Sequence, residues 1–180
     1  MFPDNVLFES NVGRLIRADL MNKCNLHTIL RLPSGIFYAQ AVKTNVLFFT
    51  RGKREKDNTK EVWVYDARAN APQFGKRTSL LREHFEQFEA AFGDDPFGST
   101  TSLSQRVDTG EEGCFRRFSR DWISERGDNL DISWLKDDRE DDNDELPEPA
   151  ILAQEAMGEL EAAIAELQGI LQELGEEISL

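Results

Sequence analysis

The spacing of hydrophobic residues predicts a helix near the start of the chain. Apolar residues recur there at three- and four-residue steps, with polar residues between them, at Val12, Leu15, Ile16, Leu20 and Cys24. Because a helix repeats about every 3.6 residues, these positions form one apolar stripe. We therefore expect an amphipathic helix after the opening turn PDN.

A pair of strands is predicted next. LHTILRL at residues 26–32 and TNVLFFT at residues 44–50 are short apolar runs of strand type, and a segment with Pro33 and Gly35 separates them. This pattern predicts strand, loop, strand. The loop also holds aromatic and amide side chains, which a simple turn does not require.

A third strand and a second helix are predicted further along. The charged run at 53–60 indicates a solvated linker, and EVWVYDA at 61–67 alternates as a strand does. Thr78 or Ser79 is expected to cap a helix that ends at Gly93. The core-facing residues of this helix are expected to be Leu81, Phe85, Phe88 and Phe92.

Residues 94–135 carry weaker signals. Residues 94–110 are rich in Gly, Ser and Thr and are expected to form a mobile loop. The following segment mixes aromatic residues with arginines, a combination found on nucleic-acid-binding surfaces and on ordinary amphipathic helices. We favour the structural interpretation, because arginine stems routinely cover apolar surface. The residues concerned are Phe115, Phe118, Trp122, Trp134, Arg116, Arg117, Arg120 and Arg126.

The C-terminal segment has the clearest periodicity in the chain. Its apolar residues are spaced alternately by four and three residues, which predicts a helix with an a/d seam that packs on another helix. The seam consists of Ala153, Met157, Leu160, Ile164, Leu167, Leu171, Leu174 and Ile178. All charged residues of this helix are glutamates, so a partner with basic flanks is favoured over a second copy. The alternative is that the helix folds back on its own body.

Charge divides the chain into parts. The net charge is −13, but residues 137–180 contain 15 acidic residues against the single basic residue Arg139. Residues 1–136 are therefore nearly neutral, and a neutral body with an acidic appendage can still bind nucleic acid. We place the body at 1–136, an acidic linker at 137–149 and the heptad helix at 150–180, since the run DDREDDNDELPEP is too charged to fold by itself.

Composition argues against several classes of protein. No stretch approaches the roughly 18 consecutive apolar residues of a membrane span, and the start of the chain does not resemble a signal peptide, so we expect a cytoplasmic protein without a membrane partner. Cys24 and Cys114 lie far apart without a CxxC spacing, and the chain has two histidines. Neither a disulfide framework nor a metal site is expected, and both cysteines are expected to be reduced and structural.

The chain resembles a known family in five segments. These segments are PDNVLFE, CNLHTILRLPSGIFYAQAVKTNVLFF, KEVWVYDAR, FGKRTSL and GDNLDISWLKDD. They are similar to the C-terminal part of the modification (M) subunit of type I restriction-modification systems, a family of adenine-N6 DNA methyltransferases that use S-adenosylmethionine. The resemblance covers about residues 2–138. The heptad helix also resembles, by pattern, the family's C-terminal helix, which docks on the DNA specificity (S) subunit.

The resemblance implies a function for the loop between the two strands. Such enzymes rotate the target adenine out of the duplex, and the extruded base needs an aromatic face on which to stack. The resemblance implies that Phe37, with Tyr38 second, supplies this face, beside a sharp turn at Gly35. The structural alternative is that Phe37 fills the end of the sheet. The implied candidates for DNA contact are Gln40, Lys43 and Asn5.

Two motifs of the family are missing from this sequence. Methyl transfer requires a glycine-rich loop beside the cofactor and an Asn-Pro-Pro-aromatic tetrad that holds the adenine amino group, and the sequence contains neither a GxG nor this tetrad. DDPF at 94–97 has one proline, and we interpret it as a chance match. Because both motifs lie upstream in the family, we interpret the chain as a truncated modification subunit, from a split or misassigned gene. Alone, it is expected to be inactive and not to bind S-adenosylmethionine.

The predicted fold is α/β: the last strands of a Rossmann-like methyltransferase sheet, then an extra strand, helices and a long C-terminal coiled-coil-type helix. The sheet edge that faces the missing half is expected to be unpaired. The predicted function is target-adenine stacking and specificity-subunit docking in N6-adenine DNA methylation. The expected partners are DNA, the specificity subunit, a separately encoded N-terminal half and the restriction subunit. The alternative function is a non-catalytic assembly module or decoy that binds the specificity subunit.

Overall fold

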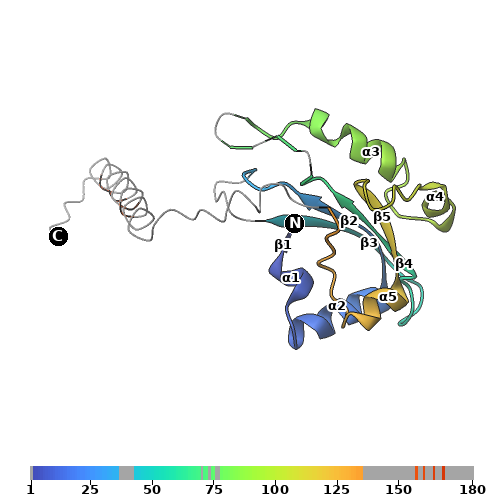
Figure 1. The fold of residues 1–180 in the computed structure, drawn as a ribbon. Coiled ribbons are helices and arrows are strands. Elements are labelled where there is room, and N and C mark those ends of the chain that lie inside the picture. The colour runs from blue at the N-terminus through green and yellow to red at the C-terminus, as the bar shows by residue number, and fades with distance from the viewer. Residues whose placement is uncertain are drawn as a thin grey trace. The chain divides into compact units, whose positions relative to one another are not determined.

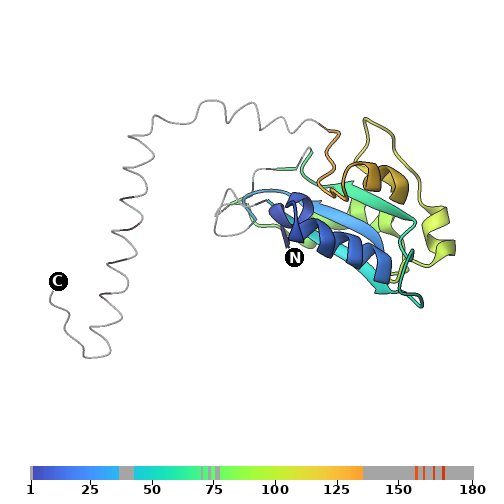
Figure 2. The same ribbon diagram turned by 90° about the horizontal axis from the view of Figure 1, so that it is seen from below.

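The structure is a computed structural model in which the chain divides into two units, Met1–Asp137 and Asp138–Leu180, each considered by itself. The first unit is a five-stranded sheet with helices on both faces (Figures 1 and 2). The residues that the structure describes are 2–36, 43–69, 71–72, 74–75 and 78–135, together with positions 157, 160, 164 and 168.

The chain enters the sheet through a short strand and two helices. β1 (Phe2–Pro3) is followed by α1 (Asn5–Phe8) and α2 (Val12–Lys23), so the first predicted helix is confirmed. The first three residues of its predicted apolar stripe, however, do not face the core: Val12, Leu15 and Ile16 are 66%, 69% and 61% exposed. Leu20 is partly buried, and Cys24, the last residue of the predicted stripe, is the buried first residue of β2 rather than part of the helix. The helix buries Arg17 and Met21 instead.

The predicted strand pair and third strand are also confirmed. β2 (Cys24–Leu32) pairs antiparallel with β3 (Thr44–Arg51), and β4 (Glu61–Asp66) pairs parallel with β2. β5 (Phe115–Ser119) closes the order β1-β3-β2-β4-β5. Since β1 and β2 both run antiparallel to β3, the strands β1, β2 and β4 end at the same edge of the sheet.

The second predicted helix begins later than expected. Residues Arg82–Phe85 form a 3-10 turn, η1, and α3 (Glu86–Phe92) continues from it to Gly93. Neither Thr78 nor Ser79 caps it; the imidazole of His84 accepts the N–H of Leu81 at 3.0 Å instead. Leu81 therefore precedes the helix in extended conformation and is exposed, which corrects its assignment to the core. Of the other three expected core residues, Phe88 and Phe92 are buried and Phe85 is partly buried.

The segment expected to be a loop at 94–110 contains a helix. α4 (Thr100–Gln105) begins after Ser99, whose hydroxyl accepts the N–H of Ser102, and it buries Leu103. This correction has a local cause, because Ser99 is a good N-cap residue and the helix has only six residues, too few to show a periodic pattern. The tetrad 94–97 lies in the turn before it, after α3, as a chance match would.

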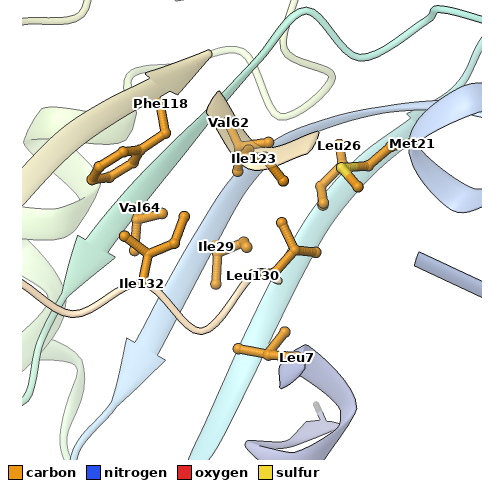
Figure 3. Close-up of a cluster of buried hydrophobic side chains, with 10 residues drawn as sticks. All are labelled: Leu7, Met21, Leu26, Ile29, Val62, Val64, Phe118, Ile123, Leu130 and Ile132. Atoms are coloured by element: carbon orange, nitrogen blue, oxygen red, sulfur yellow. The ribbon is translucent and has the colours of Figure 1, made fainter. Parts of the chain in front are cut away.

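Two buried clusters lie on opposite faces of the sheet. One packs under α1, α2 and α5 (Arg120–Glu125), and Figure 3 shows its side chains meeting between the strands and the segment that carries Leu130 and Ile132. The other packs under η1, α3 and α4 and is rich in aromatic residues. Figure 1 shows α3 and α4 on the face of the sheet opposite to α1, α2 and α5.

The aromatic and arginine-rich segment forms β5 and α5 rather than one amphipathic helix. Phe115 and Phe118 are buried in the two clusters. The guanidinium carbon of Arg116 lies 5.3 Å from the ring centroid of Phe118, and that of Arg126 lies 4.6 Å from the ring centroid of Trp122. These contacts support the structural interpretation of the arginines.

The remaining predictions concern the cysteines and the second unit. Cys24 and Cys114 are both free, as expected. Positions Met157, Leu160 and Ile164 are helical and exposed. The acidic linker at 137–149 and the seam residues Ala153, Leu167, Leu171, Leu174 and Ile178 lie outside the described residues, so the partner of this helix stays a prediction. In the described ranges, no helix has the length and apolar character needed to span a membrane.

Candidate functional site at the carboxyl edge of the sheet

The loop at 33–43 leaves the sheet where β1, β2 and β4 end. In open α/β sheets, ligands bind outside this carboxyl edge. The structure places two predicted contact residues here: Asn5 is the first residue of α1, two positions after β1, and the carbonyl of Lys43 accepts the N–H of Asp4 at 3.1 Å. The other predicted residues, Phe37, Tyr38 and Gln40, lie outside the described residues.

Asp4 forms the centre of a polar network at this edge. Its carboxylate accepts the Asn45 amide at 2.5 Å and both terminal nitrogens of Arg68, at 2.7 and 3.1 Å. Burial opposes ionisation of Asp4, but the hydrogen bonds from Arg68 and Asn45 and the charges of Arg68 and Arg31 outweigh it and lower its pKa. Asp4 is therefore a carboxylate whose two oxygens are both engaged.

Arg68 extends this network to four strands. Its side chain is buried just after β4, and its Nε donates to the carbonyl of Leu32 at 3.0 Å. One terminal nitrogen also lies 3.4 Å from the carbonyl of Thr44 and 3.4 Å from the side-chain oxygen of Asn45. The Arg68 amide donates to the Asp66 carboxylate at 2.9 Å. The ends of β1, β2 and β4 and the start of β3 are thus joined through one guanidinium.

Gly35 makes a close contact with the chain that follows β4. Its φ is +78°, and a Cβ at this position would lie 2.3 Å from the carbonyl oxygen of Phe74. Only glycine can take this backbone conformation without cost and also leave room for that carbonyl. The expected sharp turn at Gly35 is confirmed, and Phe74, which is 5% exposed, packs beside it.

A second buried arginine ties the segment GDNLD to the same strand ends. Arg31 on β2 lies 3.7 Å from the Asp66 carboxylate and 3.1 Å from that of Asp131, and it also donates to the carbonyl of Ile132. The conformation of 127–132 is therefore linked to the ends of β2 and β4.

Sequence analysis missed these polar residues of the site. The signal that could have found them is a charged residue inside or directly after an apolar strand, as in LHTILRL and EVWVYDAR, because such a residue is buried only when it is paired. The missed residues are Asp4, Arg31, Asn45, Asp66 and Arg68.

The arrangement supports positioning of a loop more than chemistry of its own. The acidic residue at the end of β1 uses both carboxylate oxygens on Arg68 and Asn45, and the sequence offers no glycine-rich loop beside it. The described residues therefore do not fit S-adenosylmethionine by themselves. Among them, no group of three or more His, Cys, Asp or Glu side chains is placed to hold a metal ion.

Comparison with known families gives matches over nearly the whole chain. Residues 1–144 match the family model described as N-6 DNA Methylase. Residues 146–178 match the model described as Type I restriction enzyme methylase subunit, C-terminal domain. The second match covers most of the predicted heptad helix.

Comparison with curated proteins gives relatives that are much longer. The chain is 51% identical to the Type I restriction enzyme EcoKI methylase subunit of Escherichia coli, over 96% of its own length. It is equally similar to the StySJI methylase subunit of Salmonella typhimurium, at 51% identity over 96% of the chain. It spans 37% of the length of each relative.

Comparison with solved structures supports the same fold. The crystal structure of the Type I restriction enzyme EcoKI M protein superposes with a TM-score of 0.68 and 48% sequence identity, over 98% of this chain and 40% of that one. A structure of the assembly of a type I R-M system aligns with a TM-score of 0.57 at 22% identity, over 98% of this chain and 35% of that one. The latter likeness shows the fold alone.

Proposed function

We infer the function of this chain from its family, because the chain belongs to the N-6 DNA methylases and is homologous to the C-terminal region of type I methylase subunits. We propose that it serves as the C-terminal part of the modification subunit of a type I restriction-modification system. In this role it contributes target-adenine stacking and specificity-subunit docking to site-specific N6-adenine methylation of DNA. The assembled enzyme would use S-adenosylmethionine and would include the restriction subunit.

The observation that carries this proposal is the position of the loop at 33–43. It leaves the sheet at the carboxyl edge, beside Asn5 and Lys43, and turns sharply at Gly35. An enzyme that extrudes a base must replace the stacking that the base loses. We therefore assign the stacking face to Phe37, with Tyr38 second, and assign contact with DNA to Gln40, Lys43 and Asn5.

The body of the chain leaves surfaces that another polypeptide would cover. β1 pairs with Thr44 and Asn45 only, so the described structure offers no strand beside Val46–Arg51 on that edge of β3. The apolar stripe of α2, at Val12, Leu15 and Ile16, is also exposed. Together with the missing cofactor and adenine-binding motifs, these features support a role that depends on an N-terminal half that carries those motifs.

The dependence on an N-terminal half is tested by cofactor binding. The purified chain should show no saturable binding of S-adenosylmethionine in isothermal titration calorimetry, because it has neither the glycine-rich loop nor the acidic residue that would follow it. A micromolar dissociation constant for residues 1–180 alone would overturn the proposal that the cofactor is held by residues outside this region.

The stacking role is tested in a chimera. Residues 1–180 replace the matching region of the EcoKI methylase subunit, and the chimera is assembled with the EcoKI specificity subunit. Phe37→Ala should lower the methylation rate about five- to 150-fold, because base–aromatic stacking contributes roughly 1–3 kcal/mol, whereas Phe37→Trp should retain most of the rate. Phe97→Ala is the matched control, since Phe97 is an exposed phenylalanine in the turn after α3. Equal losses for Phe37→Ala and Phe37→Trp at unchanged melting temperature would assign the loop another role.

The docking role is tested on the heptad helix. The double variant Ile164→Asp, Leu171→Asp places two charges in the middle of the seam, and burying unpaired charges costs several kcal/mol. Binding to the specificity subunit in a pull-down should be lost, while the melting curve of the free chain should not change. Retained binding would overturn the assignment of the docking residues Met157, Leu160, Ile164, Leu167, Leu171, Leu174 and Ile178.

The non-catalytic decoy has less support than the methylase role. A decoy requires only the docking helix, whereas the N-6 DNA Methylase match covers residues 1–144, the whole body of the chain. If the chain were a decoy, residues 1–136 would have no function of their own.

A further inference from the structure

Arg68 contacts both ends of the loop at 33–43. Leu32 and Thr44 are opposite each other in the β2–β3 ladder, as the last paired residues before the loop. The guanidinium donates to the carbonyl of Leu32 at 3.0 Å and lies 3.4 Å from the carbonyl of Thr44. One side chain therefore bridges the two strands at the point where the loop begins and ends.

The bridge is held in place from two further directions. Asp4, after β1, accepts both terminal nitrogens of Arg68, and its own amide donates to the carbonyl of Lys43 on the returning end of the loop. The Arg68 amide is bonded to Asp66 at the end of β4. With 6% of its surface exposed, the guanidinium has a fixed place among protein partners. The base of the loop is thus connected to two strands, β1 and β4, besides its own β2–β3 ladder.

This geometry constrains the direction in which the loop leaves the sheet. A loop anchored by one ladder pair can pivot about that pair, whereas bonds to both carbonyls from a third strand prevent the pivot. Stacking depends on placement, since a shift of about 1 Å in a group that holds a substrate can cost about 100-fold in rate. Lysine cannot replace the arginine here, because a single ammonium does not reproduce the planar fork of donors.

We propose that Arg68 is a positioning residue for target-base stacking, which it fixes through the carbonyls of Leu32 and Thr44 at the base of the loop. The inference rests on the proposed function, in which Phe37 receives the extruded adenine. Arg68 itself is buried among its protein partners and is not a DNA contact.

The test is a double-mutant cycle in the chimera with the EcoKI specificity subunit. Arg68→Lys should lower the methylation rate about tenfold when Phe37 is present, but less than about twofold in the Phe37→Ala background, since coupled residues act non-additively. DNA with 2-aminopurine at the target position should report the same loss as reduced fluorescence change on binding, because less of the base is extruded.

Arg17→Lys is the matched control. Arg17 is also buried and also donates to two backbone carbonyls, those of Asp128 and Val6, neither of which belongs to the ladder ends at Leu32 and Thr44. Any loss of rate it causes through stability should be the same with and without Phe37. Asp4→Asn is the second test variant, because it weakens the hold on Arg68 without removing the guanidinium. Asp4→Asn should also lower the methylation rate only when Phe37 is present, by a smaller factor than Arg68→Lys. If Arg68→Lys does not fold, the result for Asp4→Asn tests the proposal by itself.

Two results would count against the inference in different ways. If Arg68→Lys and Asp4→Asn reduce the rate by the same factor in both backgrounds, Arg68 supports the fold only and the inference is wrong, while the stacking role of Phe37 stands. If Phe37→Ala leaves the rate and the 2-aminopurine signal unchanged, the proposed stacking itself fails, and the inference fails with it.

Discussion

The two faces of the sheet are covered in different ways. Under η1, α3 and α4, aromatic rings pack on one another, with centroids 4.9 Å apart for Trp63 and Phe115 and 5.2 Å apart for Tyr65 and Phe88. Under α1, α2 and α5 the cluster is mostly aliphatic, and the irregular segment with Leu130 and Ile132 completes it (Figure 3). The aromatic face is closed by its own helices, whereas the aliphatic face carries a helix whose apolar stripe points outward.

Polar contacts explain the orientation of α2. Asp128, in a left-handed conformation with φ of 58°, lies 2.7 Å from Arg120 on α5 and 3.6 Å from Arg14 on α2. The carbonyl of Asp128 accepts Nε of Arg17 at 2.8 Å. These bonds place the arginine side of α2 against the body, so Leu15 and its apolar neighbours face away. Apolar periodicity therefore identifies residues that share one face of a helix. Which face is buried depends also on the contacts that the polar face can make, here those of Arg14 and Arg17.

The largest effect is expected on the aromatic face. Phe88→Ala removes a buried ring that packs against Tyr65, Phe48 and Phe92, and it should lower the free energy of unfolding by about 3–5 kcal/mol, the usual range for a buried phenylalanine. Denaturant unfolding followed by tryptophan fluorescence measures this. Phe97→Ala, at an exposed position, should change the value by less than about 0.5 kcal/mol. Similar values for the two variants would mean that the ring cluster does not hold this face together.

A smaller, pH-dependent effect is also expected on the aromatic face. His27 is fully buried against Phe92, and burial, followed by the charge of Arg106, lowers its pKa to about 4 from the ordinary value of 6.5. Between these pH values the unfolded chain binds a proton that the folded chain does not, so the folded state should lose about 3 kcal/mol as the pH falls from 6.5 to 4. Urea unfolding at several pH values measures the slope.

The histidine variants separate this effect from general acid sensitivity. His27→Gln should remove the slope between pH 6.5 and 4, and His84→Gln, at the only other histidine of the sequence, should keep it. Asp4 contributes at lower pH. Because its pKa is lowered, the stability that it provides is complete above its unfolded value of 3.8 and is lost only as the pH falls below that value. A slope that persists in His27→Gln would contradict the assignment to His27.

The elements of the fold were largely predictable from local sequence. The strands at 24–32, 44–51 and 61–66 are short segments rich in apolar and β-branched residues, and Gly93 ends α3 as expected of a glycine after a helix. Failures occurred where a single side-chain contact sets the end of an element or where the element is short. The start of the helix near Leu81 depends on the His84 side chain, and α4 has six residues without a repeating pattern.

The site was predictable only through resemblance and only in part. Lys43, Asn5 and Gly35 come to the expected edge of the sheet. The network around Arg68 joins residues 4, 32, 44 and 68, and nothing in the spacing of these residues along the chain indicates that they meet. A buried charged residue is recognisable in a sequence as unusual, but its partner is fixed by strand order, which emerges only from the complete sheet.

The smallest effect on stability is expected for the exposed stripe of α2, which is the feature that most clearly distinguishes the aliphatic face from the aromatic face. Ile16→Ser should change the unfolding free energy of the free chain by less than about 0.5 kcal/mol, because the side chain is 61% exposed. In contrast, it should weaken association with the part of the EcoKI methylase subunit that precedes the matched region about tenfold, since losing the burial of one aliphatic side chain costs about 1.5 kcal/mol.

Analytical titration of the two polypeptides measures this association, and melting of the free chain measures stability. Val107→Ser is the matched control, a β-branched and equally exposed residue outside the stripe, and it should change neither quantity. A fall of several degrees in the melting temperature of free Ile16→Ser would mean that the chain covers the stripe itself, because only a buried isoleucine stabilises the fold. Unchanged association at unchanged stability would mean that the second polypeptide binds elsewhere, and the difference between the two faces would then reflect the arginine contacts of α2 alone.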